Sequence, residues 1–139
     1  MEQEDYLKRQ IDVLGQVLGR MLAKLPGSGS LGLSIENLEE VNQGLKNQLG
    51  LDFEKLESIS PDQFVKNLQA GREWNENNLD KLSDLLMMLA ADLRQKETEK
   101  NKIRHLADKS LAIQEYIDRT SLTYSFDRHR KMEEIKKML

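Results

Sequence analysis

Apolar residues in the first part of the chain recur at the spacing of an amphipathic helix. Between Glu4 and Leu25 they return every three or four positions, which places them on one face of a helix. Val13 and Val17 widen this face. Pro26 ends the predicted helix, and the glycine- and serine-rich residues 26–33 predict a flexible linker. The seam of this helix consists of Leu7, Ile11, Leu14, Leu18, Met21 and Leu25.

Residues that cap the first turn of a helix recur after the linker. Each stands directly after one apolar residue and four positions before another, which is the arrangement of a hydrophobic staple. The strongest is Ser60, because Pro61 and Gln63 add a favourable first helical residue and a capping-box partner. The predicted caps are Ser34, Asp52, Ser60 and Asn75.

Glycines indicate where the short helices between these caps end. Gly50 and Gly71 stand at positions where a residue in the left-handed conformation closes a helix. The predicted short helices cover about residues 35–49, 52–58 and 61–70.

From Glu76 onward the sequence contains neither glycine nor proline. A leucine stripe over residues 79–93 and a weaker apolar stripe over residues 103–117 are separated by a polar run, residues 94–101. This run is either the exposed middle of one helix of more than about forty residues or a turn between two antiparallel helices. The turn is favoured, because two helical turns without an apolar side chain gain nothing from packing.

The end of the sequence predicts a loop and one more helix. Residues 119–125 are rich in Thr, Ser and Tyr, a composition that favours a loop. Ser125 can cap a last helix, on which Phe126, Ile135 and Leu139 are the apolar residues.

An antiparallel helix pair followed by a third helix, over residues 79–139, resembles the tetratricopeptide family of helical-hairpin repeats. Small residues stand where the helices of such a repeat approach each other: Ala90 and Ala91 on the first, with Ala107, Ser110 and Leu111 on the second. The resemblance implies an all-α fold of antiparallel hairpins, a right-handed array of about five to six helices behind the tethered N-terminal helix. It also implies a scaffold that binds a protein or a peptide. The whole chain is similar to bacterial proteins of comparable helical build, which implies no particular activity.

Composition is consistent with one thin helical domain. A chain of 139 residues fits a single domain, and its 38% hydrophobic and 32% charged residues are typical of elongated helical proteins. We expect an N-terminal amphipathic helix over residues 1–25, a linker over 26–33 and a helical domain over 34–139.

Two features bear on the location of the protein. The sequence contains no cysteine, which excludes disulfides and thiolate chemistry, and no secretory apolar segment precedes the first helix, so that the cytoplasm is expected. No stretch approaches the roughly 18 consecutive apolar residues of a membrane span.

Charge is distributed unevenly along the sequence. Residues 34–92 carry twelve acids and five bases, a balance of −7, whereas residues 93–139 carry eight acids and twelve bases, a balance of +4. Attraction between the two segments within the fold is favoured over a basic face that recruits an acidic partner. Nucleic acid is not expected as a partner, because acids such as Glu97 and Glu133 are interleaved with the bases and would repel phosphates.

The sequence holds no recognisable constellation for catalysis or metal binding. His105 and His129 each have an acid about one turn away, Asp108 and Glu133, but a zinc site needs three or four ligands, and such pairs are usually surface ion pairs. No serine stands in a G-x-S-x-G context. We therefore expect no enzyme, no catalytic residue, no cofactor and no metal.

Four residues are candidates for contact with a protein or peptide partner. Trp74 would suit an interface anchor, although a staple with Leu79 is the favoured interpretation. Tyr116, Arg119 and Tyr124 flank the last loop and are candidates for lining a peptide groove. For the tyrosines the favoured interpretation is closure of the core edge with their hydroxyls in water.

The seam of the first helix must be covered, because an exposed apolar strip of this size marks an interaction surface. It packs either on the rest of the chain or on a second copy, and the linker permits both. A homodimer through the first helix is the favoured hypothesis, and intramolecular docking is the next. The predicted function is a non-enzymatic scaffold that binds a protein or peptide; the alternative is a self-associating structural or regulatory oligomer.

Overall fold

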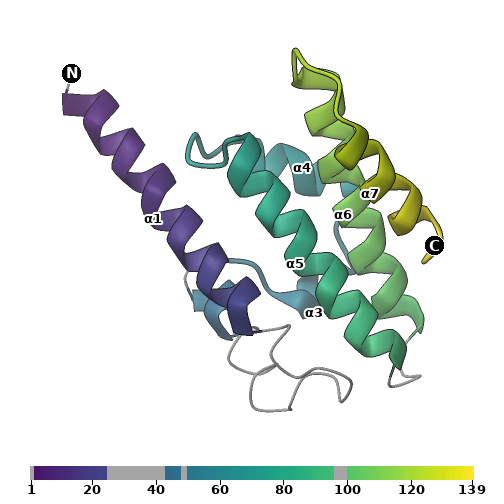
Figure 1. Ribbon diagram of the computed structural model, residues 1–139. Helices are drawn as coiled ribbons and strands as arrows, with labels where there is room; N and C mark the ends of the chain where they lie inside the picture. Colours follow the sequence, from purple (N-terminus) through teal and green to yellow (C-terminus); the bar gives the residue numbers. More distant parts are fainter. Residues whose placement is uncertain (1, 25–42, 48–49, 96–99) are drawn as a thin grey trace.

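The computed structural model describes residues 2–24, 43–47, 50–95 and 100–139, and the regular structure of these residues is entirely helical (Figure 1). The all-α fold class is therefore confirmed. A further helical stretch covers residues 43–47. The predicted linker, the Ser34 cap and most of the predicted helix 35–49 lie outside the described residues. The helices are α1 (Glu2–Lys24), α3 (Phe53–Leu56), α4 (Pro61–Gln69), α5 (Glu76–Gln95), α6 (Lys100–Thr120) and α7 (Phe126–Lys136).

Ser60, Asn75 and Ser125 cap the helices that the sequence predicts for them. The side-chain oxygens of Ser60 and Ser125 accept hydrogen bonds from the backbone N–H three residues later, at 3.2 and 3.1 Å, and so begin α4 and α7. Asn75 caps α5 in the same way, at 2.9 Å. The side chain of Gln63 donates to Asn67 Oδ1 at 2.8 Å, one turn further along the helix surface.

The two glycines singled out in the sequence behave differently. Gly50 has a φ of 68°, the left-handed conformation that closes a helix, and the next N–H, of Leu51, donates to the carbonyl of Leu45 at 2.9 Å. Gly71 does not have a positive φ, so the prediction for this residue is wrong. A Cβ there would lie 2.7 Å from the carboxylate of Glu73, a flexible group that would have to move.

Helices α5 and α6 lie side by side in opposite directions and form the centre of the molecule (Figure 1). The prediction of two helices in place of one long helix is confirmed, and residues 96–99 between them lie outside the described residues. Ser83 and Ser110 meet at the contact with Oγ atoms 2.7 Å apart, and Ser110 Oγ donates to the Ser83 carbonyl at 2.9 Å. Ala90 and Ala107 are fully buried, so small side chains permit the close approach of these helices.

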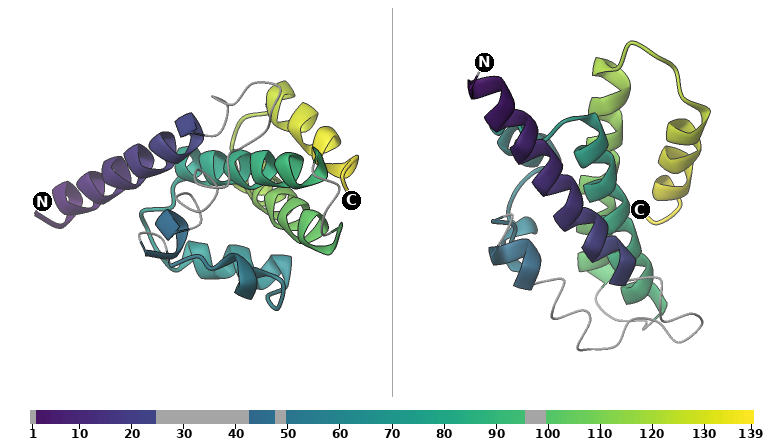
Figure 2. Two further views of the ribbon diagram at one scale, coloured as in Figure 1. Left: turned by 90° about the horizontal axis from the view of Figure 1, so that it is seen from below. Right: turned by 60° about the vertical axis from the view of Figure 1, so that its left-hand side comes forward.

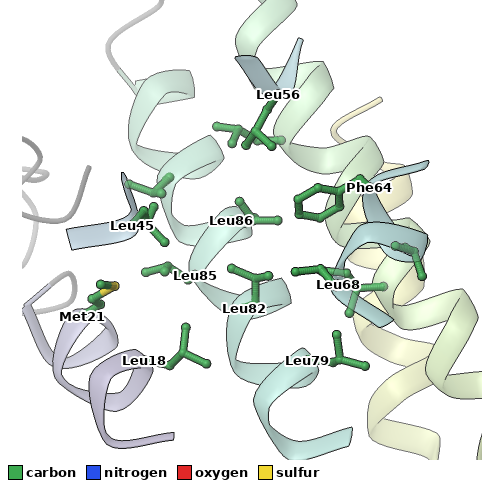
Figure 3. Close-up of a cluster of buried hydrophobic side chains, with 14 of the residues drawn as sticks. Leu18, Met21, Leu45, Leu56, Phe64, Leu68, Leu79, Leu82, Leu85 and Leu86 are labelled. Carbon is green, nitrogen blue, oxygen red and sulfur yellow. The ribbon is translucent and has the colours of Figure 1, made fainter. Parts of the chain in front are cut away.

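The apolar core forms where α1, residues 43–47 and α4 cover the leucines of α5 (Figure 3). Leu18 and Met21 of α1 lie near Leu85, and Leu45 lies beside them. On the other side of α5, side chains from α4 point toward the remaining leucines. The members of α4 that enter this core are Phe64, Val65 and Leu68, all buried.

Helix α1 runs along α5 and is fixed there by polar contacts as well as by its seam. Asn78 Nδ2 donates to the carbonyl of Ile11 at 3.1 Å, and Lys81 Nζ donates to the carbonyl of Gly15 at 3.4 Å. A Cβ at Gly15 would stand 3.1 Å from Asn78 Oδ1, whereas one at Gly19 would meet nothing within 4 Å. Gly15 therefore provides the close approach. The N-terminal part of α1 projects beyond the other helices (Figure 2).

Helix α7 packs on α6 with few apolar contacts. Its buried residues are Arg128 and Ile135, and Ile135 lies outside the main hydrophobic cluster, although Met138 just after the helix packs against that cluster. The other two apolar residues named for this helix in the sequence are exposed, Phe126 at 81% and Leu139 at 45%.

Candidate functional site

A groove of about 470 Å³ lies between residues 43–47, α3, α4 and the segment before α5, and Trp74 lines it. We call it the Trp74 groove. Its buried floor consists of Leu56, Phe64 and Leu68. The half-buried apolar side chains on its walls are Leu51, Ile59 and Trp74, and its other lining residues are Lys46, Gly50, Asp52, Lys55, Asn67, Gly71 and Glu73.

Local sequence signals position the walls of this groove. Gly50 is in the left-handed conformation, and the N–H of the next residue, Leu51, donates to the Leu45 carbonyl at 2.9 Å, which ties the groove wall to the 43–47 stretch. The segment before α5 is held by two hydrogen bonds: the N–H of Trp74 donates to the Gly71 carbonyl at 3.3 Å, and Asn78 Nδ2 donates to the Glu73 carbonyl at 2.9 Å. Because Asn78 also binds α1, one buried amide connects the groove wall to the first helix.

The groove combines an apolar interior with charges of both signs at its rim. Lys46 and Lys55 are exposed, and Glu73 is half-buried. Such a surface suits apolar side chains of a peptide, with polar groups at the edge to orient the peptide backbone. The sequence placed five of the six apolar lining residues in separate staple pairs, and Leu68 in none, but it gave no signal that they share one groove.

The other three predicted contact residues lie away from the walls of the Trp74 groove. Tyr116 is half-buried and packs against the core, and Arg119 is exposed near the end of α6. Tyr124 is 65% exposed; its ring stacks on His129 with centroids 4.6 Å apart and meets Phe126 edge to face at 5.1 Å. None of the three lines the Trp74 groove.

A second site, which is polar and which the sequence did not predict, lies where α7 meets the α5–α6 hairpin. Lys131 Nζ binds Asp80 Oδ1 at 3.0 Å and Asp84 Oδ1 at 3.1 Å. Gln114 Nε2 also donates to Asp80 Oδ1, at 2.8 Å. The only sequence signal was the charge imbalance between the two segments, and these ion pairs join the acid-rich segment to the basic one, as the favoured interpretation predicts.

Burial and charge act in opposite directions on this cluster. Burial raises the pKa of Asp84, and the nearby Lys131 only partly offsets this effect. Burial also lowers the pKa of Lys131, but hydrogen bonds and charges from Asp80 and Asp84 outweigh it, and the net pKa lies above the ordinary value.

Arg128 holds the start of α7 on the same surface. Its Nε donates to Asp118 Oδ1 at 3.2 Å, its Nη2 donates to the Thr123 carbonyl at 2.8 Å, and Glu76 lies 3.7 Å from its Nη1. The guanidinium is buried and satisfied. His129 Nε2 lies 3.2 Å from the same Asp118 carboxylate, so its acidic partner is Asp118 and not the predicted residue of its own helix.

Two buried polar groups have no hydrogen-bond partner among the described residues: Lys109 Nζ and Gln114 Oε1. Lys109 is 1% exposed, and burial lowers the pKa of its amine despite the charges of Asp108 and Glu57. Burying an ammonium group without a hydrogen-bond partner costs free energy, so Lys109 should destabilise the folded state.

The predicted oligomer seam is covered within the chain over most of its described length. Leu14, Leu18 and Met21 are buried, and Leu7 and Ile11 are half-buried. Leu25 lies outside the described residues. A homodimer through this seam stays a prediction.

Searches against known proteins add no relationship. No protein-family profile, no curated protein and no solved structure matches the chain. Among the described residues, no three His, Asp or Glu side chains come together as a possible metal-ligand set. None of the helices in the described ranges is long and apolar enough to cross a membrane. The cytoplasmic location stays a prediction.

Proposed function

We propose that the protein is a non-enzymatic helical scaffold that binds a peptide segment of a partner protein in the Trp74 groove. The observation that carries this proposal is the groove itself. It has a volume of about 470 Å³, an apolar floor and a half-buried tryptophan on its wall. Tryptophan side chains in such partly buried positions supply much of the binding energy of protein interfaces. A peptide with one or two large apolar side chains fits this chemistry.

A tetratricopeptide-like arrangement is the architecture that we propose for this scaffold. The α5–α6 pair would be the hairpin of one repeat, and α7 would be the first helix of the next. The close contact at Ser83 and Ser110, with Ala90 and Ala107 fully buried, supports this proposal. The right-handed array is part of the same proposal.

Selection of displayed peptides against the full chain tests the binding function. We expect peptides rich in apolar anchors to bind and to shift the fluorescence of Trp74, which is the only tryptophan of the chain and so reports on the groove alone. Trp74→Ala should weaken the selected peptides by at least about tenfold, as for an interface hot spot. Tyr124→Ala, an exposed aromatic outside the groove, is the matched control. Equal binding to wild type and Trp74→Ala, or failure to select any peptide, would refute the proposal.

Self-association through α1 is a second candidate function, favoured by large apolar side chains that are exposed on this helix. Tyr6 is 61% and Val13 52% exposed, on a helix whose N-terminal part projects from the other helices (Figure 2). Light scattering at micromolar concentration tests it: a dimer that Val13→Glu dissociates supports the candidate, and a monomeric wild type removes it.

A further inference from the structure

Helix α7 rests on an acidic surface that we call the α7 seat, formed by Glu76, Asp80 and Asp84 on α5 and Asp118 on α6. Two basic residues of α7, Arg128 and Lys131, reach these four carboxylates. Charge complementarity is therefore the main feature of the contact.

Apolar packing beneath α7 is sparse. Ile135 is the one buried apolar side chain of the helix, and it lies outside the main hydrophobic cluster. Cavities of about 380 and 290 Å³ lie along the contact, and Lys131 lines both of them. Gln114, fully buried on the wall of the larger cavity, has an Oε1 atom without a hydrogen-bond partner in the part of the chain that the structure describes. The seat is therefore incompletely filled.

The features of α7 that the seat recognises lie on one helical face. Arg128, Lys131 and Ile135 are three and four positions apart, so they project toward the hairpin together. Phe126 at the start of the helix is in solvent and makes no comparable contribution. A helix with two cations followed by an aliphatic residue at this spacing would make the same contacts.

We propose that the α7 seat is a binding site for a basic amphipathic helix of a partner protein, and that α7 is its resident, exchangeable occupant. The ion pairs of Lys131 with Asp80 and Asp84 are partly exposed, and such pairs break more readily than buried apolar contacts, because water solvates the separated charges and salt screens them. Locally unstable elements of this kind are the ones that exchange. This site is separate from the Trp74 groove and does not depend on the function proposed there.

A synthetic peptide with the sequence of residues 121–139, labelled with fluorescein, is the probe for the seat. The protein is the full chain with Lys131→Glu, which places a third negative charge beside Asp80 and Asp84 and so displaces its own helix. We expect saturable binding by fluorescence anisotropy, at least about tenfold tighter than to wild type, whose seat is filled. The matched protein control is Lys137→Glu, because Lys137 is exposed and its ion pair, with Glu134, lies within one turn of the chain and away from the seat.

Three further variants make the result decisive. Ile135→Ser loosens α7 with every charge retained and should also admit the peptide, so the test does not depend on one variant. Asp80→Asn with Asp84→Asn in the Lys131→Glu chain should weaken binding at least about tenfold, and the same holds for a peptide that itself carries Lys131→Glu. The peptide should leave Trp74 emission unchanged. No binding to either loosened chain, binding that ignores the two aspartates, or a shift of Trp74 emission would overturn the proposal.

Discussion

The two outer helices α1 and α7 are attached to the same hairpin by different forces. Helix α1 buries Leu14, Leu18 and Met21 in the core, and two of its backbone carbonyls accept hydrogen bonds from side chains of α5. Helix α7 buries one aliphatic side chain and relies on ion pairs from Arg128 and Lys131. Salt does not weaken apolar burial, whereas it screens partly exposed ion pairs such as those of Lys131. The molecule therefore combines a firmly docked helix with an exchangeable one.

The largest expected effect concerns the seam of α1. Leu18 is fully buried between α1 and α5, and Leu18→Ala should lower the free energy of unfolding by about 2–5 kcal/mol through lost burial and the cavity left behind. Urea denaturation followed by circular dichroism measures this loss. Leu122→Ala, at a fully exposed leucine, is the control and should change stability by less than about 0.5 kcal/mol. A small effect at Leu18 would show that α1 is not docked by its seam.

Two lysine-to-methionine substitutions sharpen the contrast, because their signs should be opposite. Lys109 is buried with no hydrogen-bond partner among the described residues, and Lys109→Met should raise stability by about 1–3 kcal/mol. Lys131 is partly exposed and paired, and Lys131→Met should lower stability by only about 1 kcal/mol after allowance for screening by water. Stability changes of the same sign in the two variants would contradict the account of these two sites.

The pH dependence of the same two variants follows from their pKa shifts. The folded-state pKa of Lys109 lies below its ordinary value of 10.5, so the unfolded chain binds more protons between the two values. Stability therefore rises with pH across that window, and Lys109→Met removes the rise. The pKa of Lys131 is raised above 10.5, so its contribution is complete below 10.5 and is lost as pH rises through the folded-state value. Denaturation midpoints from pH 7 to about pH 11 measure both trends.

The smallest effect comes from the glycines of α1. The Cβ added by Gly19→Ala would meet nothing within 4 Å. The substitution should stabilise the helix by about 0.5–1 kcal/mol, because alanine has a higher helix propensity than glycine. At Gly15 the same substitution meets Asn78 Oδ1 at 3.1 Å, so the gain should be smaller or absent. Thermal melts of the two variants give the difference. Equal stabilisation would mean that α1 does not approach α5 closely at Gly15.

The sequence was sufficient for features that depend on neighbours within about one or two helical turns. The seam of α1, the caps at Ser60, Asn75 and Ser125, and the interruption between α5 and α6 all follow from local patterns. The staple pairs around Trp74 were also predicted one by one.

Features that depend on distant partners were beyond the sequence. Lys131 meets Asp80 and Asp84 across 51 and 47 residues, and a charge count cannot choose among the many possible partners. The same reason explains why the acid suggested for His129 was wrong: the acid about one turn away in its own helix is not the one that lies beside it in space. Phe126 was predicted as an apolar residue of the last helix, but its side of α7 faces solvent.

Hydrogen exchange of the full chain at low and at high salt tests the central claim most directly, because it reports on α1 and α7 in one sample. We predict that raising sodium chloride from about 0.05 to 1 M speeds amide exchange in residues 126–136 by severalfold and leaves residues 14–21 of α1 unchanged or slower. Equal responses of the two helices, or faster exchange in α1 alone, would contradict the account.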